Sequence, residues 1–329
     1  MHVSKNLLFA MTAAILLSVD SAAGPTLTHP SMAGYAYLEA PVAPTGYLGL
    51  TARFYGTTSL LFSDGRDAIV LDGFISRPGV LQVLLNPIQP VDSLVDLIIS
   101  DSKPATIRAV LVAHAHYDHS LDAPYLASKS GAMMMGTEST RYAAIGQKFI
   151  GDFKVPTPHE PIDLGPYSVT AFRSPHSPGA MATGRMTETL TAPAHASRMS
   201  DNENFSYLLT FQKTRSFLLH PSANFAPGLY KDVRAEVVFL GIAGLSKQGE
   251  QFTRQYWKET VEAVGARLVI PVHWDALYIP LAEPMQPLPV AYGDFDETMG
   301  LLVKLAGESR QTTLRLMPVR HPVVIDRLQ

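Results

Sequence analysis

The sequence predicts an α/β fold, a sandwich built from two successive halves. Strand-like apolar runs alternate with stretches of helical spacing, and this order occurs twice, ahead of His114 and again ahead of His273. Strand meanders with helices between them favour layers of sheet and helix over a barrel or an all-helical bundle. Because 47% of the 329 residues are hydrophobic, the chain can bury one large core or two modest ones.

The first half should begin with antiparallel strands in residues 48–74, divided by the turn signal Ser63-Asp64-Gly65. Helical spacing follows over residues 80–99, and the apolar run 108–113 predicts a fully buried strand. A second helix should span 121–131 and stop at the glycine, and three consecutive Met residues predict a buried strand at 133–135.

The second half repeats this texture. Four segments predict strands, of which the first alternates toward His176: 165–176, 206–211, 216–220 and 236–244. Residues 249–265 have helical spacing, and the strand 266–275 runs into His273. The aperiodic segment 181–204 predicts a long irregular loop, which in a compact domain is often a functional lid.

The N-terminus has the layout of a secretory signal peptide. Lys5 precedes an apolar stretch, Leu7 to Val19, and small residues lead up to an expected cleavage after Ala23. The alternative, an uncleaved anchor, would be short for a bilayer span of ~20 residues. We therefore expect an exported protein, periplasmic or secreted, with a signal peptide at 1–23, an extended arm or linker at 24–45, one domain at 46–329 and no membrane span after cleavage.

Charge and cysteine content exclude several classes of function. The net charge is −3 and no run of like charges occurs, so neither nucleic acid nor an anionic membrane surface is an expected partner. Small molecules are the expected partners, and the sequence does not indicate an oligomeric state. Without cysteine the chain has no disulfide, thiolate ligand or cysteine nucleophile, so any metal must be held by His and carboxylate side chains.

The strongest functional signal is HAHYDH, residues 114–119, directly after a buried strand. Neutral imidazole and carboxylate are good zinc ligands, and the spacing of two places His114 and His116 on one side of an extended segment. Asp118 and His119 can point to a neighbouring position. A polar loop of solvated histidines is the alternative, but four ligand types in six residues at a strand end favour a metal site.

This stretch resembles the H-x-H-x-D-H signature of the metallo-β-lactamase superfamily, over roughly residues 46–329. Three further landmarks of the family match, one before the motif and two after it: Asp72 in VLDG, His176 in RSPHSP and His273 in IPVHWD. The resemblance implies a four-layered αββα sandwich with one or two zinc ions at one edge. It implies His114, His116 and His176 as ligands of the first ion. It implies Asp118, His119 and His273 as ligands of the second, with Asp72 orienting them.

One position departs from the family pattern. Where the family usually places an Asp that bridges the two metals, this chain has Ser222 in HPSANF, as in a less characterised branch of the superfamily. A serine hydroxyl is a poor ligand unless deprotonated. Three alternatives stay open: a single metal, two metals bridged through hydroxide alone, or recruitment of His220. A strand-end histidine bonded to backbone is the simpler reading of His220.

The resemblance implies a zinc-dependent hydrolase in which metal-bound hydroxide attacks a small ester, lactone or related substrate, with Asp118 holding or accepting a proton. Tyr117, Phe225, Trp274 and Tyr278 flank the expected ligands and are candidates for a pocket wall. A non-catalytic metal-binding protein and a di-iron redox protein are the alternatives. The second is disfavoured because His116 stands where di-iron members usually have Glu.

Overall fold

The computed structural model describes residues 28–179 and 181–327. The predicted signal peptide, residues 1–23, lies outside these described residues. Within them, no helix is both long and apolar enough to cross a lipid bilayer.

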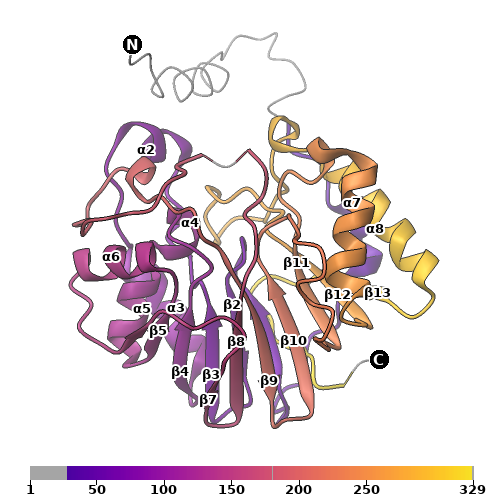
Figure 1. The fold of residues 1–329 in the computed structure, drawn as a ribbon, viewed down its shortest axis with the longest axis horizontal. Helices are drawn as coiled ribbons and strands as arrows, with labels where there is room; N and C mark the ends of the chain where they lie inside the picture. The colour runs from indigo at the N-terminus through magenta and orange to yellow at the C-terminus, as the bar shows by residue number, and fades with distance from the viewer. Residues whose placement is uncertain (1–27, 180, 328–329) are drawn as a thin grey trace.

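Two seven-stranded sheets form the centre of the molecule (Figure 1). The first has the order β14-β1-β2-β3-β4-β5-β6: β1 (Thr51–Phe54), β2 (Leu60–Ser63), β3 (Asp67–Leu71), β4 (Thr106–Leu111), β5 (Met133–Met135), β6 (Phe153–Lys154) and β14 (Val323–Val324). The second has the order β13-β12-β11-β10-β9-β8-β7: β7 (Pro161–Leu164), β8 (Tyr167–Arg173), β9 (Phe205–Phe211), β10 (Arg215–His220), β11 (Val237–Gly241), β12 (Leu268–Val272) and β13 (Thr313–Leu314).

Both sheets change from antiparallel to parallel pairing in the same way. Strands β1, β2 and β3 form an antiparallel meander, and β3 to β6 are parallel. Likewise β7 to β10 are antiparallel, and β10 to β13 are parallel. Parallel neighbours need crossover connections, usually helices, which is why the helical stretches follow each meander along the chain.

Helices cover the outer face of each sheet, which confirms the predicted α/β sandwich (Figure 1). On the side of the first sheet lie α2 (Val80–Leu85), α3 (Asp92–Ser102), α4 (Tyr117–Ser120), α5 (Ala123–Ser130) and α6 (Glu138–Gly146). On the other side lie α7 (Gly249–Trp257), continued by a π-helical turn (Lys258–Glu262), and α8 (Phe295–Ser309).

Local sequence signals set several helix ends. Helix α8 begins at Asp294, whose side chain accepts a hydrogen bond from the Glu297 amide at 3.0 Å. Helix α6 begins in the same way at Thr137. Both are the N-cap arrangement that satisfies a free amide of the first turn. Helix α5 ends at Gly131, whose φ of 70° is left-handed, as expected for a glycine that terminates a helix.

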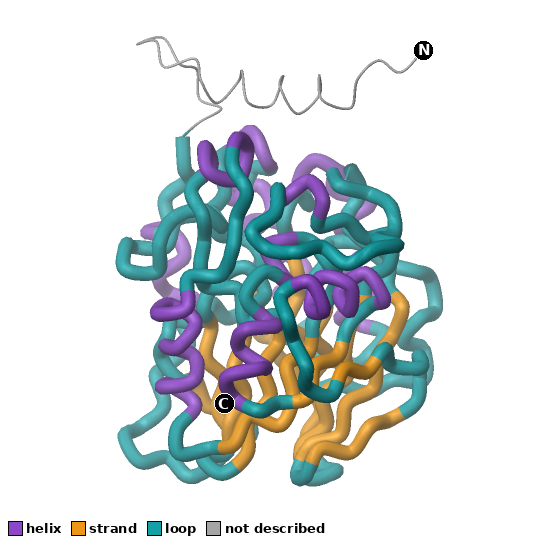
Figure 2. The backbone as a smooth tube through the Cα atoms, turned by 90° about the vertical axis from the view of Figure 1, so that its left-hand side faces the viewer, coloured by secondary structure: helices purple, strands orange, loops and turns teal. Residues whose placement is uncertain are grey.

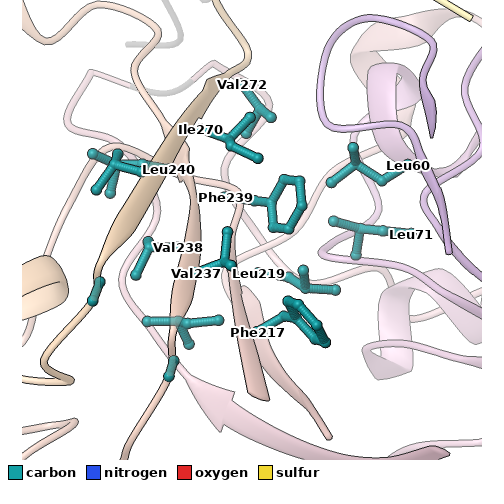
Figure 3. Packing of buried hydrophobic residues seen from close by; sticks show 14 of the residues in the cluster. Leu60, Leu71, Phe217, Leu219, Val237, Val238, Phe239, Leu240, Ile270 and Val272 are labelled. Carbon is teal, nitrogen blue, oxygen red and sulfur yellow. The ribbon is translucent and has the colours of Figure 1, made fainter. Parts of the chain in front are cut away.

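The main core lies between the two sheets. Along β3, Ile69 and Leu71 face the second sheet, while Ala68 and Val70 face the cluster under α3 and α5, so the strand is buried on both sides. Figure 3 shows Phe217 and Phe239 directed from the second sheet toward the side chains of the first. Phe62 of β2 meets the Phe239 ring edge-on, with ring centroids 5.3 Å apart.

The described part of the expected arm packs against the domain and is not an extended linker. Residues Ala33–Leu38 form a short 3-10 helix, η2, and Leu38 and Ala40 are buried in the main core. The Ala40 amide donates to the Leu316 carbonyl at 2.8 Å. The composition predicted an extended arm or linker, but the described part of this segment is held on the sandwich by buried Leu38 and Ala40 and by backbone hydrogen bonds.

A buried ion pair joins the two halves of the fold. Arg77, in the segment after β3, donates to the Asp275 carboxylate at 2.6 Å, and both side chains are almost fully shielded from solvent. The Arg77 guanidinium also donates to the carbonyls of Ala276 and Ile279. Asp275 in turn accepts from the Thr57 amide of the β1–β2 loop at 2.7 Å. These bonds tie the chain after β12 to two loops of the first sheet.

Replacing Arg77 with Met should lower the free energy of unfolding by about 3–5 kcal/mol, because the Asp275 carboxylate would stay buried without its cation. Urea denaturation of the purified protein measures this loss. The matched control is Arg254→Met, since Arg254 pairs with Glu250 and Glu308 on the surface. Its loss should leave the urea concentration at the midpoint of unfolding nearly unchanged. Equal, small effects of both variants would contradict the role given to the buried pair.

Candidate metal centre

Loops and short helices gather at one end of the molecule, above the strands in Figure 2. The HAHYDH stretch belongs to this region because it follows the end of β4 and runs into the one-turn helix α4. His116 precedes α4, and its carbonyl accepts from the amides of His119 and Ser120 at 3.0 and 2.9 Å. This tight turn brings His119 back toward the same place as His114.

The structure brings His114, His116 and His176 together. The His114 Nε2 atom lies 3.0 Å from Nδ1 of His116 and 3.2 Å from Nε2 of His176. His176 follows β8, so this group combines one residue pair from the first sheet with one residue from the second. All three ligand atoms lie within 4.8 Å of one another.

A second group contains Asp118, His119 and His273. The Asp118 Oδ2 atom lies 3.6 Å from Nε2 of His119 and 3.3 Å from Nε2 of His273. His273 follows β12, so this group also takes ligands from both sheets. In the described part of the chain, these are the two places where three such side chains converge as a metal ion would require.

Both groups fit a zinc ion by donor chemistry and spacing. Zinc is held by imidazole nitrogens and carboxylate oxygens, and a tetrahedral ion with Zn–N bonds of 2.0–2.1 Å sets its ligand atoms roughly 3.3 Å apart. The measured separations of 3.0–3.6 Å bracket that value. The groups hold three ligands each, which leaves a position for water or substrate, as in catalytic sites.

The first group is neutral at physiological pH. Burial lowers the pKa of His114 well below its ordinary value, and the neighbouring histidines lower it further. Burial likewise lowers the pKa of His116, and it lowers that of His176 to about 4. Because metal ions bind the unprotonated ring, protons compete weakly for this group.

The second group is charged. Burial alone would raise the pKa of Asp118, but His119 and His273 beside it outweigh burial and hold that pKa well below its usual range. Burial lowers the pKa of His119, but the carboxylates of Asp118 and Asp72 outweigh this effect and raise it. The carboxylates of Asp118, beside the His119 ring, and of Asp72, behind it, therefore favour a positive charge at this position.

Asp72 contacts the second group from behind. Its Oδ2 atom lies 2.8 Å from Nδ1 of His119, and Thr58 donates a hydrogen bond to the same oxygen. Its Oδ1 atom accepts from the Ala113 amide at 2.8 Å. Asp72 therefore directs the Nε2 atom of His119 toward the centre, as outer carboxylates do in metal sites.

Asp72 and His273 both have left-handed φ angles, 55° and 58°, which are uncommon outside glycine.

Asn204, which sequence analysis missed, orients the first group. Its Oδ1 atom accepts from Nδ1 of His114 at 3.0 Å, so the Nε2 atom of that ring is directed to the centre. Its Nδ2 atom donates to the Ser174 hydroxyl at 2.8 Å, which fixes the amide in this orientation. The sequence offered no signal for Asn204, because an asparagine is not a ligand type of the motif and its contact with His114 spans 90 residues of chain.

Ser222 and His220, which lie where the family usually has the bridging Asp, have different surroundings. Ser222 lines the cavity at the centre, and its hydroxyl donates to Oδ1 of Asn204 at 3.3 Å. His220 does not join either group. Its Nδ1 atom lies 2.8 Å from the Ser206 hydroxyl and its Nε2 atom 2.8 Å from the Asn224 carbonyl, so both ring nitrogens have other partners.

A cavity of about 330 Å³ opens onto both groups. Five of the six proposed ligands contribute to its wall, and so do Tyr117 and Tyr278, two of the four aromatic residues proposed for it. The other two do not line it. Trp274 packs in the core against Phe54 and Phe295, and Phe225 packs against Phe252. Sequence places an aromatic residue near a ligand but does not determine the direction of its side chain.

Comparison with known proteins identifies the fold. Residues 52–165 match the family model for the metallo-beta-lactamase superfamily. No curated protein matches the sequence. A solved structure of Igni18, a metallo hydrolase from the archaeon Ignicoccus hospitalis, is 13% identical with a TM-score of 0.55, over 85% of this chain and 99% of that one. CmlA from Streptomyces venezuelae, a diiron β-hydroxylase, is 16% identical with a TM-score of 0.50, over 86% of this chain and 55% of that one.

Replacing Asn204 with Leu should weaken metal binding about 10- to 100-fold, because His114 would lose the acceptor that sets its ring orientation. Competition with a chromophoric chelator measures the affinity. Asn202→Leu is the control, since Asn202 is exposed two residues away and outside both groups. If the two variants bound metal equally well, Asn204 would have no orienting role.

Proposed function

We propose that this chain is a member of the metallo-β-lactamase superfamily and that it is a zinc-dependent hydrolase of a small ester, lactone or related substrate. The observation that carries the proposal is that two groups of three metal-ligand atoms open into one cavity. The ligand chemistry is compatible with zinc, since five of the six ligands are imidazoles, which bind zinc and also iron.

Metal ions bound at such a site lower the pKa of a water toward neutrality and polarise the oxygen of the electrophile. The chain's own residues would supply three further functions. His114, His116 and His176 are neutral, so they leave the positive charge of a metal uncompensated on the substrate side. The ionised carboxylate of Asp118 lines the cavity wall, where it can hold the attacking water by accepting a hydrogen bond from it.

Tyr117 would act beside Asp118. Burial and the charge of Asp118 raise the pKa of the Tyr117 hydroxyl well above its ordinary value, so this group keeps its proton. A protonated phenol at the cavity wall can donate a hydrogen bond to an oxygen that gains negative charge during acyl transfer. The cavity thus combines a hydrogen-bond acceptor and a hydrogen-bond donor at adjacent positions in the chain.

The di-iron alternative has weaker support from the ligands. The second group, Asp118 with His119 and His273, has the two-histidine, one-carboxylate composition that also suits non-haem iron, but the first group has no carboxylate. Ser222 stands where the family pattern would place a bridging Asp, and its hydroxyl is hydrogen-bonded to Asn204.

We also propose that the protein is exported, on the strength of the signal-type sequence at residues 1–23.

The purified protein should contain stoichiometric zinc, and it should lose hydrolysis of esters or lactones when a chelator removes the metal and regain it when zinc is added. His116→Ala should lose metal and activity together, since His116 contributes Nδ1 to the first group. Elemental analysis and a panel of lactones, esters and phosphodiesters provide the two measurements.

His195→Ala is the control for this variant. His195 is an exposed loop histidine outside both groups, and its replacement should change neither property. Iron in place of zinc would favour the redox alternative. Full zinc content with no hydrolysis of any compound in the panel would favour a non-catalytic metal-binding protein.

A further inference from the structure

The described wall of the cavity holds no lysine or arginine side chain. Its one carboxylate and its imidazoles all belong to the two proposed metal groups. Arg77 lies close enough to act on the Tyr117 hydroxyl, but it is buried behind the wall and paired with Asp275. Arg198 lies nearby in the chain but is exposed and faces Glu188.

The wall away from the metal centre is apolar. Its larger aliphatic side chains come from three separate segments: Val80, Val83, Leu84, Met181, Met199, Leu277 and Leu288. Three tyrosines complete it: Tyr117, Tyr278 and Tyr292. Burial raises the pKa of Tyr278 to about 12 and also raises that of Tyr292, so these phenols add hydrogen-bond donors and no charge.

Helix α2 contributes to the cavity wall, and one of its residues, Val83, also packs against a buried cluster that contains Phe74. Five of its six residues are apolar, and none of them is buried. Val80, Val83 and Leu84 have the i, i+3, i+4 spacing of one helix face, and all three line the cavity. Leu85, by contrast, is 64% exposed. Figure 1 shows α2 and α4 in the upper part of the molecule, and α4 contains Asp118 and His119 of the second group.

A substrate that carried an anionic group far from the bond to be cleaved would bury that charge against these side chains without a partner, which is unfavourable. An uncharged aliphatic or aromatic group would instead gain contact with the wall. A volume of about 330 Å³ is at the small end for ligand pockets. The geometry therefore points to the class of substrate.

We propose that this cavity takes a small ester or lactone whose remainder, away from the scissile bond, is an uncharged apolar group. That the substrate is an ester or lactone rests on the proposed hydrolase function. That its remainder is apolar rests on the side chains of the cavity wall. The inference excludes substrates with an anionic group away from the scissile bond, such as dicarboxylic monoesters.

The first test uses two substrates that differ in distal charge, 4-nitrophenyl hexanoate and mono-4-nitrophenyl adipate. The wild-type protein should hydrolyse the neutral ester with kcat/KM about 10-fold higher or more, because the adipate carboxylate finds no lysine or arginine on the described wall. Leu84→Lys should raise kcat/KM for the adipate and narrow this ratio. Leu85→Lys, on the exposed face of the same helix, should leave the ratio unchanged. Equal rates for the two esters would overturn the proposal.

The second test measures binding without hydrolysis. The neutral dye N-phenyl-1-naphthylamine and its anionic relative 8-anilinonaphthalene-1-sulfonate report binding to apolar sites by fluorescence. Leu84→Lys should weaken binding of the neutral dye and strengthen binding of the anionic dye, and Leu85→Lys should change neither. Val83→Lys, on the cavity face, provides a second variant if Leu84→Lys does not fold.

The outcomes separate the inference from the proposed function. If the dyes follow this pattern but no ester is hydrolysed, the apolar cavity stands and the hydrolase proposal fails. If esters are hydrolysed but the two cavity-face variants behave like Leu85→Lys with both substrates and dyes, the hydrolase stands and the cavity-wall inference fails. A wild-type protein that does not bind the neutral dye also overturns the inference.

Discussion

The packing of the two sheets against each other is the constraint on which the metal centre depends. Each group of ligands takes side chains from both sheets, so neither sheet could form either group alone. The ring of Phe62 against Phe239 represents the apolar contact that sets this packing. The bonds of Arg77 and Asp275 then fix the segment after β12 relative to the first sheet, two residues from His273. Burial brings the halves together, and the directional bonds determine their relative position at the centre.

At the centre, three of the histidine side chains are held by a partner on the ring nitrogen that does not face the metal positions. Asn204 holds His114, Asp72 holds His119, and the Ser177 carbonyl holds Nδ1 of His176 at 3.0 Å. Each of these bonds leaves the opposite ring nitrogen directed to the centre. The two groups nevertheless differ in charge, because the first is three neutral imidazoles and the second contains an ionised carboxylate with another behind it. Two metals held here would therefore have different surroundings, without a carboxylate between them.

Much of the architecture could be predicted from the sequence. The strands at β4, β5, β9 to β12 and the helix ending at Gly131 lie where the apolar periods placed them, because buried strands and amphipathic helices leave regular patterns. The grouping of ligands followed from the family resemblance, and the structure brings the same six residues together. Their role as ligands stays a prediction. The packing of residues 28–45 was missed, since a short docked segment leaves no period of its own.

The sequence by itself determined the types of chemistry available, because the six residues 114–119 concentrate metal ligands at a strand end and the chain lacks cysteine. Only the tertiary structure decided which further side chains join them. It directed His220 to Ser206 and Asn224, placed Asn204 behind His114, and turned Trp274 into the core while Tyr278 lines the cavity. The physical reason is that local sequence determines backbone periodicity, whereas the direction and partners of a side chain depend on atoms far away along the chain. The uncharged wall of the cavity is a property of the same kind, since it is assembled from α2, the loop before β9 and the segment after His273.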